Sequence, residues 1–288
     1  MTRPRVLLTG ATGLIGRHLA APLEAAGYAV HAVSRRSGDD ILADPEGLVA
    51  RAGASHLLHL AWHDGPDRWS APANLDWVAA SLRLLRAFAA SGGRRAVLVG
   101  SCAEYDWTGD GHLSEDMAPR PATLYGAAKA ATGMAAMAGA GPLGLSLAWA
   151  RVFFVYGPGE PEGRLFGDLI KGLARGEAVA CTDGLQRRDF LHSADVAGAL
   201  AALLASDVTG AVNIGSGQAV PVRDMIETIA RQMGRPDLVR LGARKRPAGD
   251  PDLIEADARR LLADVGFRPR YDTHSGIRAV LTAEGVLA

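Results

Sequence analysis

A tyrosine and a lysine four positions apart form the most informative pair in the sequence. They occur in Tyr125-Gly126-Ala127-Ala128-Lys129, in a chain with only five tyrosines and three lysines. Residues four apart lie on one face of a helix, so the phenol and the ammonium can interact. A neighbouring ammonium lowers the pKa of a phenol from its usual value of about 10. Such a tyrosine can exchange a proton with a substrate oxygen while a hydride moves at the adjacent carbon.

A serine upstream of this pair is placed to assist the same chemistry. Ser101 follows the apolar run at residues 96–99 and Gly100. In open α/β sheets the carboxyl ends of the strands face the ligand crevice, so the Ser101 hydroxyl can bind a reacting oxygen. A serine at the end of a strand is by itself more often a turn residue. The Tyr–Lys pair favours the catalytic interpretation.

A glycine-rich turn lies between the first apolar run and the first helical segment. Its first glycine permits a tight turn, its second lets the backbone approach a pyrophosphate, and its third allows close packing of helix on sheet. Free N–H groups in such a turn hold phosphates. The turn therefore predicts dinucleotide binding, with a purely structural turn as the alternative. The predicted cofactor contacts are Gly10, Thr12, Gly13, Leu14, Ile15 and Gly16.

The end of the second predicted strand indicates which dinucleotide binds. It reads Ser34-Arg35-Arg36, without the carboxylate that NAD-binding proteins place near the ribose 2′-hydroxyl. A guanidinium at this position suits a 2′-phosphate, so Arg35 and Arg36 favour NADP. The alternative is that both arginines are solvated and that the protein takes NAD.

Alternating strand and helix signals predict how these residues are brought together. Strand-like runs occur at residues 6–9, 28–34, 41–43, 56–61, 96–99 and 145–152. Helical periodicity separates them at residues 14–26, 74–90 and 122–138. Apolar strands separated by helices predict an α/β fold, a doubly wound parallel sheet of the Rossmann type.

The second half of the sequence is less regular. Helical segments are expected at residues 165–175, 194–205 and 222–233, with a short strand at 212–214. We expect residues 1–156 to form the dinucleotide-binding domain, with 186–215 returning to it. Residues 157–185 and 216–288 are expected to form mainly a smaller, C-terminal substrate-binding domain.

Composition argues against several function classes. Of 288 residues, 48% are hydrophobic, and 31 Lys+Arg balance 31 Asp+Glu, which disfavours nucleic-acid and membrane-surface binding. No apolar run is long enough to span a bilayer and no signal peptide is evident, which predicts a cytoplasmic protein. His56, His59 and His63 form no ligand set at metal spacing, so no metal is expected. Cys102 and Cys181 are expected to be plain thiols.

These motifs together resemble the extended short-chain dehydrogenase/reductase family. The resemblance rests on TGATGLIG, Ser101, YGAAK, Arg188-Asp189-Phe190-Leu191-His192 and Asp195-Val196-Ala197, and it covers nearly the whole chain. It implies that Ser101 binds the substrate oxygen, that Tyr125 is the acid–base, and that Lys129 binds the cofactor ribose and tunes Tyr125. Members of the family are largely nucleotide-sugar epimerases, dehydratases and ketoreductases.

The resemblance also implies binding residues outside these motifs. Asp44 corresponds to a position that meets the adenine, and Ala61 to backbone that passes the cofactor. Arg188 and Arg246 correspond to arginines that bind the substrate diphosphate, although Arg188 has an ion pair with Asp189 as its alternative. Cys102 and Glu104, next to Ser101, are further predicted substrate contacts, and His63, Trp62 and Trp69 either line the substrate cleft or pack in a loop.

Two departures from the family pattern narrow the function. Phe154 stands where an asparagine commonly contacts the substrate phosphate. Cys102 and Ala103 stand where dehydratases of the family carry adjacent Asp and Glu, and elimination needs its own acid and base. Dehydratase activity is therefore disfavoured.

The expected function is an NADP-dependent ketoreductase acting on a nucleotide-activated 4-keto-6-deoxy sugar. The first alternative is a nucleotide-sugar epimerase with tightly bound NAD, and the second is a non-catalytic dinucleotide-binding regulator. The small residues in the 122–138 helix and the family resemblance predict a homodimer through this helix and the 74–90 helix, with an ordinary buried helix as the alternative.

Overall fold

A six-stranded parallel sheet forms the larger part of the molecule. The computed structural model describes residues 3–160 and 163–287, except for the side chain of Arg36. The strand order is β11-β6-β4-β3-β1-β2. The strands are β1 (Arg5–Thr9), β2 (Ala29–Val33), β3 (His56–His59), β4 (Arg95–Ser101), β6 (Ser146–Val152) and β11 (Gly210–Ile214). Because β1 pairs with both β2 and β3, the strand order reverses there and a crevice opens at the carboxyl ends of the strands.

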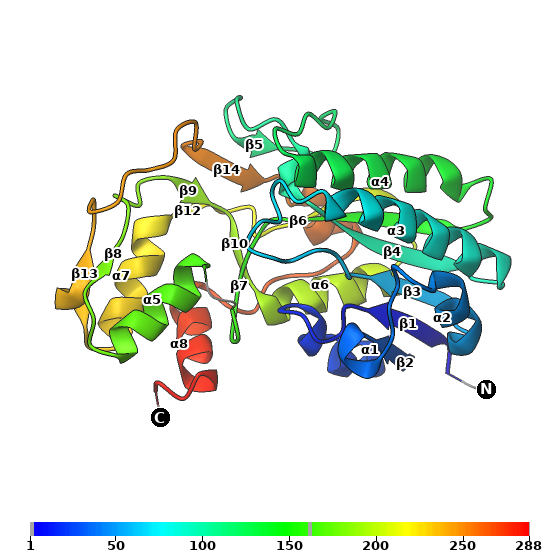
Figure 1. Cartoon of the computed structure of the whole chain (residues 1–288), viewed down its shortest axis with the longest axis horizontal. Coiled ribbons are helices and arrows are strands. Elements are labelled where there is room, and N and C mark those ends of the chain that lie inside the picture. The colour runs from blue at the N-terminus through cyan, green and yellow to red at the C-terminus, as the bar shows by residue number, and fades with distance from the viewer. Residues whose placement is uncertain (1–2, 161–162, 288) are drawn as a thin grey trace.

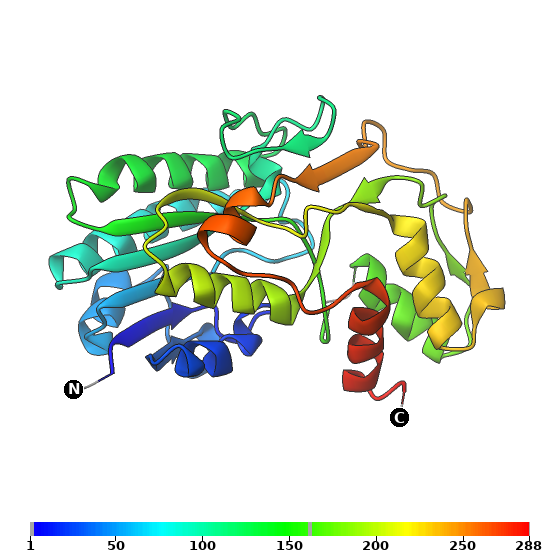
Figure 2. The same ribbon diagram turned by 180° about the vertical axis from the view of Figure 1, so that it is seen from behind.

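Helices cover both faces of this sheet (Figures 1 and 2). One face carries α2 (Pro45–Ala52), α3 (Ala73–Ala90) and α4 (Leu124–Ala140), and the other carries α1 (Ala20–Ala25) and α6 (Ser193–Ala205). Alternation along β4 builds the two cores: Leu98 packs with Leu84 of α3, and Val97 packs with Leu200 of α6. The predicted α/β, doubly wound fold is confirmed.

Small residues allow α4 to lie close to the sheet. Its N-cap is Thr123, whose hydroxyl accepts a hydrogen bond from the Gly126 N–H at 3.1 Å. A Cβ at Gly133 would lie 2.6 Å from the Trp149 ring of β6, so any larger residue would force the helix away. This close approach carries Tyr125 and Lys129, near the start of α4, to the end of β4.

Short strands and three helices form a smaller second part beside the carboxyl ends of the sheet (Figure 2). Its four-stranded sheet has the order β12-β9-β14-β5, and β10–β7 and β13–β8 form two further pairs. Its strands are β5 (His112–Leu113), β7 (Phe154–Tyr156), β8 (Val179–Ala180), β9 (Arg187–Arg188), β10 (Phe190–His192), β12 (Val220–Pro221), β13 (Val239–Arg240) and β14 (Leu253–Ala256). Its helices α5 (Leu165–Ala174), α7 (Val222–Gln232) and α8 (Thr273–Ala283) share one apolar core.

The chain passes between the two parts more than once. After β9 and β10, α6 and β11 rejoin the larger part. Leu261 and Phe267, which follow β14, also pack on the core that contains α6. The two parts are therefore interwoven rather than joined by a single linker.

Two expected elements are wrong in detail. Residues 41–43 form a turn and not a strand: the Leu42 N–H donates to the Asp40 carboxylate at 3.0 Å, and Asp44 then caps the N-terminus of α2. The expected 14–26 helix is a 3₁₀ turn, Gly16–His18, followed by α1. Pro22 lies in the first turn of α1, where a backbone N–H has no partner within the helix, so it causes no kink.

The expected homodimer would form through the outer surface of α3 and α4. The two helices pack side by side on one face of the sheet, and the side chains of Leu75 and Met134 are each 59% exposed. A homodimer through this surface stays a prediction. Among the described residues, no helix has both the length and the apolar character needed to cross a bilayer.

Candidate active site

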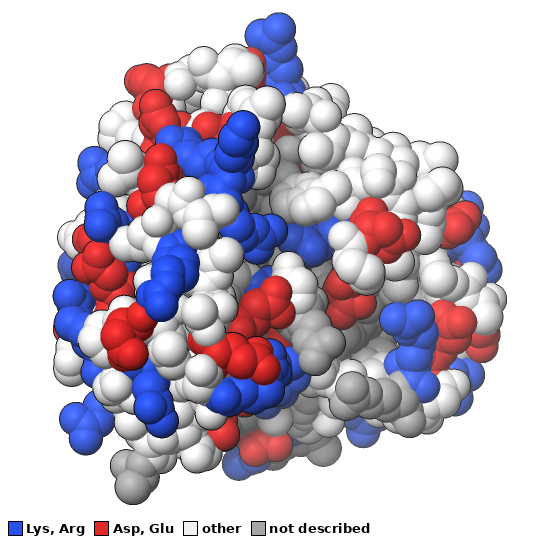
Figure 3. All heavy atoms as spheres, turned by 60° about the vertical axis from the view of Figure 1, so that its left-hand side comes forward, with Lys and Arg blue, Asp and Glu red and all other residues white. Residues whose placement is uncertain are grey.

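A cleft of about 900 Å³ lies between the two parts of the molecule. The glycine-rich turn, the end of β2 and the ends of β3 and β4 line it on one side, and β7, β9 and the loop before α5 line it on the other. Figure 3 shows the hollow with basic and acidic side chains gathered around it. The cleft is at the carboxyl ends of the parallel strands, where the sequence predicts the ligand site.

The glycine-rich turn has the geometry of a phosphate site. Gly10 has φ +72°, and a Cβ there would lie 2.8 Å from the Ala61 N, while a Cβ at Gly16 would lie 2.1 Å from the Gly10 O. Within residues 3–160 and 163–287, no hydrogen bond is donated by the backbone N–H groups of Thr12, Leu14 and Ile15. Unpaired N–H groups along a cleft suit the pyrophosphate of a dinucleotide, so the turn fits this cofactor.

Of the other predicted cofactor residues, some line the cleft and others do not. Arg35 and Ala61 line the cleft, whereas the side chain of Arg36 lies outside the described part of the chain. Asp44 does not line it: its carboxylate caps α2 by accepting from the Gly47 N–H at 2.8 Å. Asp39 and Ile41, earlier in the same loop, line the cleft instead.

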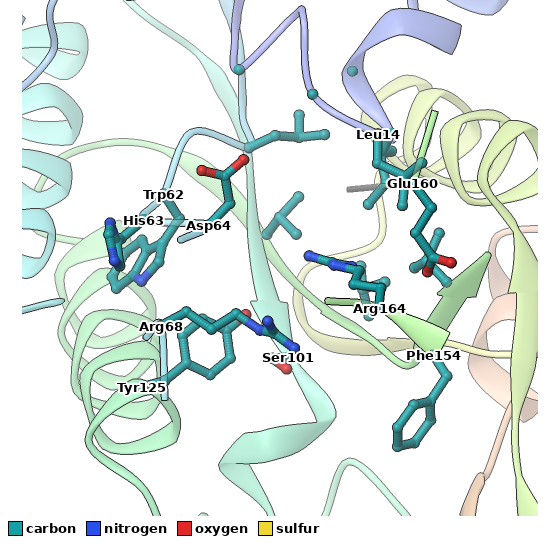
Figure 4. A pocket seen from close by; sticks show the side chains of 18 of the residues that line it. Leu14, Trp62, His63, Asp64, Arg68, Ser101, Tyr125, Phe154, Glu160 and Arg164 are labelled. Carbon is teal, nitrogen blue, oxygen red and sulfur yellow. The ribbon is translucent and has the colours of Figure 1, made fainter. Parts of the chain in front are cut away.

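Ser101 and Tyr125 meet in the cleft (Figure 4). Ser101 is the last residue of β4, and Tyr125 is the second residue of α4. The Tyr125 N–H donates to the Trp69 O at 3.2 Å, and the two rings pack edge to face with centroids 5.4 Å apart. Trp69 therefore fixes the tyrosine relative to the loop after β3.

Lys129 lies beneath this pair in a closed environment. Its Nζ donates to the Val99 O at 2.8 Å and sits 3.8 Å from the centroid of the Trp62 ring, against 6.0 Å from the Tyr125 ring. Trp62 is fixed in turn by a hydrogen bond to Asn74 at 2.8 Å. Trp62 therefore positions the lysine, a role that its place after β3 does not reveal.

Burial shifts the pKa values of the phenol and the amine in opposite directions. Burial raises the pKa of Tyr125 to about 12, and hydrogen bonding to Ser101 and the charge of Arg68 act against this rise. Burial lowers the pKa of Lys129 to about 7, and the charge of Glu104 acts against this fall. The expected lowering of the Tyr125 pKa by Lys129 is absent from the protein by itself, because the amine is turned to Val99 and Trp62.

Glu104 is a correction to the predicted substrate contacts. Its side chain is buried and accepts from the Ser101 N–H at 2.7 Å and from the Arg151 Nε at 2.9 Å. The Trp149 indole N–H donates to it at 2.9 Å as well. All of these contacts lie within the protein interior, so Glu104 positions Ser101 and does not face the substrate.

The predicted diphosphate arginines differ in their placement. Arg188 lines the cleft and pairs with Asp250, not with Asp189 as the alternative had it. Asp189 instead accepts from the N–H groups of Ser216 and Gly217. Arg246 does not line the cleft and is paired with Asp250 and Asp252 at 3.5 and 3.0 Å.

Several other residues complete the description of the cleft. Cys102 lines it, and burial raises the pKa of its thiol to about 12, so it is not a thiolate. Phe154 lines it with the Arg188 guanidinium 5.6 Å from its ring centroid, and Trp62, His63 and Trp69 also line it. The three-dimensional arrangement of residues 3–160 and 163–287 contains no group of His, Cys, Asp and Glu suited to a metal ion.

Charged residues of the cleft that were not predicted from the sequence include Asp64, Arg68, Glu160 and Arg164 (Figure 4), and Arg17, Asp39 and Asp250 line it as well. Asp64 and Arg68 belong to the loop after β3, next to residues that the sequence did indicate. The rule that loops at the carboxyl ends of strands face the ligand was a sufficient signal for them. Glu160 and Arg164 come from the second part, and no motif marks them.

The chain is similar to proteins of one known family. The model of the NAD dependent epimerase/dehydratase family matches residues 6–215. The chain belongs to this family. The sequence-based prediction of a family of NAD(P)-dependent nucleotide-sugar enzymes is thereby confirmed.

Individual members of the NAD-dependent epimerase/dehydratase family are similar over different lengths. The dTDP-L-rhamnose 4-epimerase of Burkholderia thailandensis is 33% identical over 57% of this chain and 47% of its own. The GDP-6-deoxy-D-mannose reductase of Pseudomonas aeruginosa is 27% identical over 96% of each chain. The structure of MoeE5 in complex with UDP-glucuronic acid and NAD is 33% identical, with a TM-score of 0.85 over 98% of this chain and 99% of its own. MoeE5 in complex with UDP-glucose and NAD is 32% identical over 98% of each chain, with the same TM-score.

Replacing Glu104 with glutamine tests the buried ion pair. Glu104→Gln leaves the Arg151 guanidinium buried without its counter-charge, so we expect the free energy of unfolding to fall by about 3–5 kcal/mol. Urea denaturation measures this change. Glu46→Gln is the matched control, because Glu46 pairs with Arg83 at 2.7 Å on the surface and its loss should leave the unfolding curve unchanged. Equal effects of the two substitutions would contradict the structural role of Glu104.

The pH dependence of stability tests the environment of Lys129. Its pKa falls from 10.5 to about 7 on folding, so the unfolded chain binds more protons between these pH values. The contribution of Lys129 to stability must therefore rise as the pH rises from 7 to 10. We therefore expect the unfolding free energy of the wild type, relative to that of Lys129→Met, to rise as the pH increases over this range. The exposed Lys245 provides the control Lys245→Met, and a constant difference for Lys129→Met would refute the assignment.

Proposed function

We propose that the protein is a nucleotide-sugar 4-epimerase that acts on a UDP-linked hexose with a firmly held NAD. The observation that carries this proposal is the meeting of the glycine-rich turn, Ser101, Tyr125 and Lys129 in one cleft. Similarity over the whole chain to MoeE5, whose structures hold NAD with UDP-glucose or UDP-glucuronic acid, supports the choice of substrate. A purely regulatory protein would not need all three reactive side chains.

The side chains of the cleft have distinct tasks in this proposal. A bound NAD would supply the acceptor for a hydride and, later in the same cycle, its donor. Tyr125 takes the proton of the sugar 4-hydroxyl as that carbon is oxidised, and it gives the proton back on reduction. Ser101 holds the 4-oxygen by a hydrogen bond, and Lys129 binds the cofactor ribose. Because the pKa of Tyr125 is about 12 without ligands, positive charge near the phenol is needed for it to act as a base.

A second candidate is the NADPH-dependent reduction of a nucleotide-linked 4-keto-6-deoxy sugar. Arg35 favours it, because this guanidinium lines the cleft at the end of β2, where a 2′-phosphate would lie. The reductase of Pseudomonas aeruginosa is similar at 27% identity over 96% of the chain. The sequence alone favours this candidate, whereas the higher identity to the NAD-bound MoeE5 structures leads us to place epimerisation first.

Replacing Tyr125 with phenylalanine tests the proposed acid–base. Tyr125→Phe removes the hydroxyl but keeps the ring against Trp69, so we expect kcat to fall by about 10²–10⁴-fold with little change in nucleotide-sugar affinity. Ser101→Ala should lower kcat as well, by a smaller factor. Full turnover by Tyr125→Phe would contradict the mechanism.

The cofactor carried by the purified protein separates the two candidates. For an epimerase we expect NAD to be released on denaturation, and UDP-glucose or UDP-glucuronic acid to be converted to the 4-epimer without added cofactor. Chromatography of the released nucleotide and NMR of the sugar product measure both. Stoichiometric NADPH oxidation on a 4-keto-6-deoxy sugar nucleotide, without epimerisation, would establish the reductase instead.

A further inference from the structure

Two arginines from opposite sides of the cleft converge near Tyr125. Arg68 belongs to the loop after β3, and Arg164 precedes α5 in the second part. In Figure 4 their guanidinium ends point toward one another above Ser101 and Tyr125. Burial lowers the pKa of Arg68 and the charge of Arg164 lowers it further, while the charges of Tyr125, Asp64 and Glu160 act in the opposite direction. Like charges brought together in a half-buried cleft are stabilised when an anion binds between them.

The backbone around Arg68 is fixed relative to the reaction centre. The Arg68 O accepts from the Asn74 amide at 2.8 Å, and the next residue, Trp69, accepts the hydrogen bond from the Tyr125 N–H. The Arg68 guanidinium carbon lies 4.8 Å from the centroid of the Trp69 ring, which itself packs on Tyr125. Arg68 is therefore held beside Tyr125, where the proposed function places the sugar.

The nearby carboxylates act on the two guanidinium groups through their charge without a close ion pair. The charges of Asp64 and Glu160 raise the pKa of Arg68, and the charge of Arg164 opposes the rise that burial causes in the pKa of Glu160. Among the residues that the structure describes, neither Arg68 nor Arg164 forms an ion pair within 4.0 Å. Asp64 is exposed to solvent. Glu160 accepts the Gly167 N–H at 2.9 Å, and its carboxylate points away from Arg68 in Figure 4.

We infer that Arg68, assisted by Arg164, recognises a carboxylate on the sugar ring, so that the preferred substrate is a nucleotide-linked uronic acid. This inference rests on the proposed function and specifies its substrate class. A uronic acid carries its carboxylate on C5, one ring position from the C4 that would face Tyr125. Arg188, farther along the cleft in β9, remains for the diphosphate.

A pair of ligands that differ only at C6 tests this inference. UDP-glucuronic acid has a carboxylate where UDP-glucose has a hydroxymethyl group. Calorimetric titration of the NAD-loaded protein should show about 10- to 100-fold tighter binding of the uronic acid. Arg68→Gln should abolish this preference while changing UDP-glucose affinity by less than about 3-fold, and Arg68→Lys should retain part of it. Arg83→Gln, on the outer surface of α3, is the control and should leave the preference intact.

Each other result overturns a defined statement. Equal affinity of the wild type for the two ligands refutes carboxylate recognition but leaves the proposed epimerase standing. Equal weakening of both ligands by Arg68→Gln assigns Arg68 to the diphosphate and also refutes the inference. Failure of the wild type to bind either ligand refutes the proposed function itself, and with it the uronic-acid preference. Thermal melting curves of each variant show whether it is folded.

Discussion

A buried carboxylate behind the reaction centre is the interaction on which the site geometry depends. The Glu104 carboxylate accepts hydrogen bonds from the backbone N–H of Ser101 and from the side chains of Trp149 and Arg151. These bonds link the ends of β4 and β6. Arg151 continues the network to the Tyr105 hydroxyl at 2.9 Å. Removing a carboxylate from water is costly, and only several donors at good geometry offset that cost. The serine at the end of β4 is consequently fixed before any ligand arrives.

The same network connects the sheet to the second part of the molecule. The Tyr105 hydroxyl donates to the Asn213 side chain of β11 at 2.7 Å, and the Asn213 amide donates to the Leu113 O of β5 at 2.8 Å. β5 is an edge strand of the smaller four-stranded sheet. The end of β4, which carries Ser101, and the edge of the smaller sheet are thus held in one hydrogen-bonded frame.

Desolvation governs the charges within the cleft. It raises the pKa of Tyr125 and lowers that of Lys129, so burial alone favours a neutral phenol and weakens the charge on the amine. The charge of Arg68, nearer the cleft surface, favours the phenolate. In the proposed reaction, proton transfer by Tyr125 would therefore depend on the guanidinium charge of Arg68 as well as on the lysine of its own helix.

Local patterns in the sequence determined much of the fold and part of the site. Alternating apolar strands and helices predicted the parallel sheet, and the glycine turn and the Tyr125–Lys129 spacing predicted which residues meet at its carboxyl edge. These features depend on neighbours within a few residues, so short-range rules suffice. Segments with few residues, such as 41–43, were assigned wrongly because an aspartate turn and a helix cap outweighed their strand propensity.

Only the tertiary structure decided the partners of the charged residues. From the sequence, Glu104 was predicted to be a substrate contact beside Ser101, because carboxylates are rarely buried unless hydrogen-bond donors surround them. Its main partner, Arg151, comes from another strand. The pairing of Arg188 with Asp250 and the convergence of Arg68 with Arg164 likewise join segments far apart in the chain. Charge interactions depend on distance and burial in space, and neither quantity is encoded in the local order of residues.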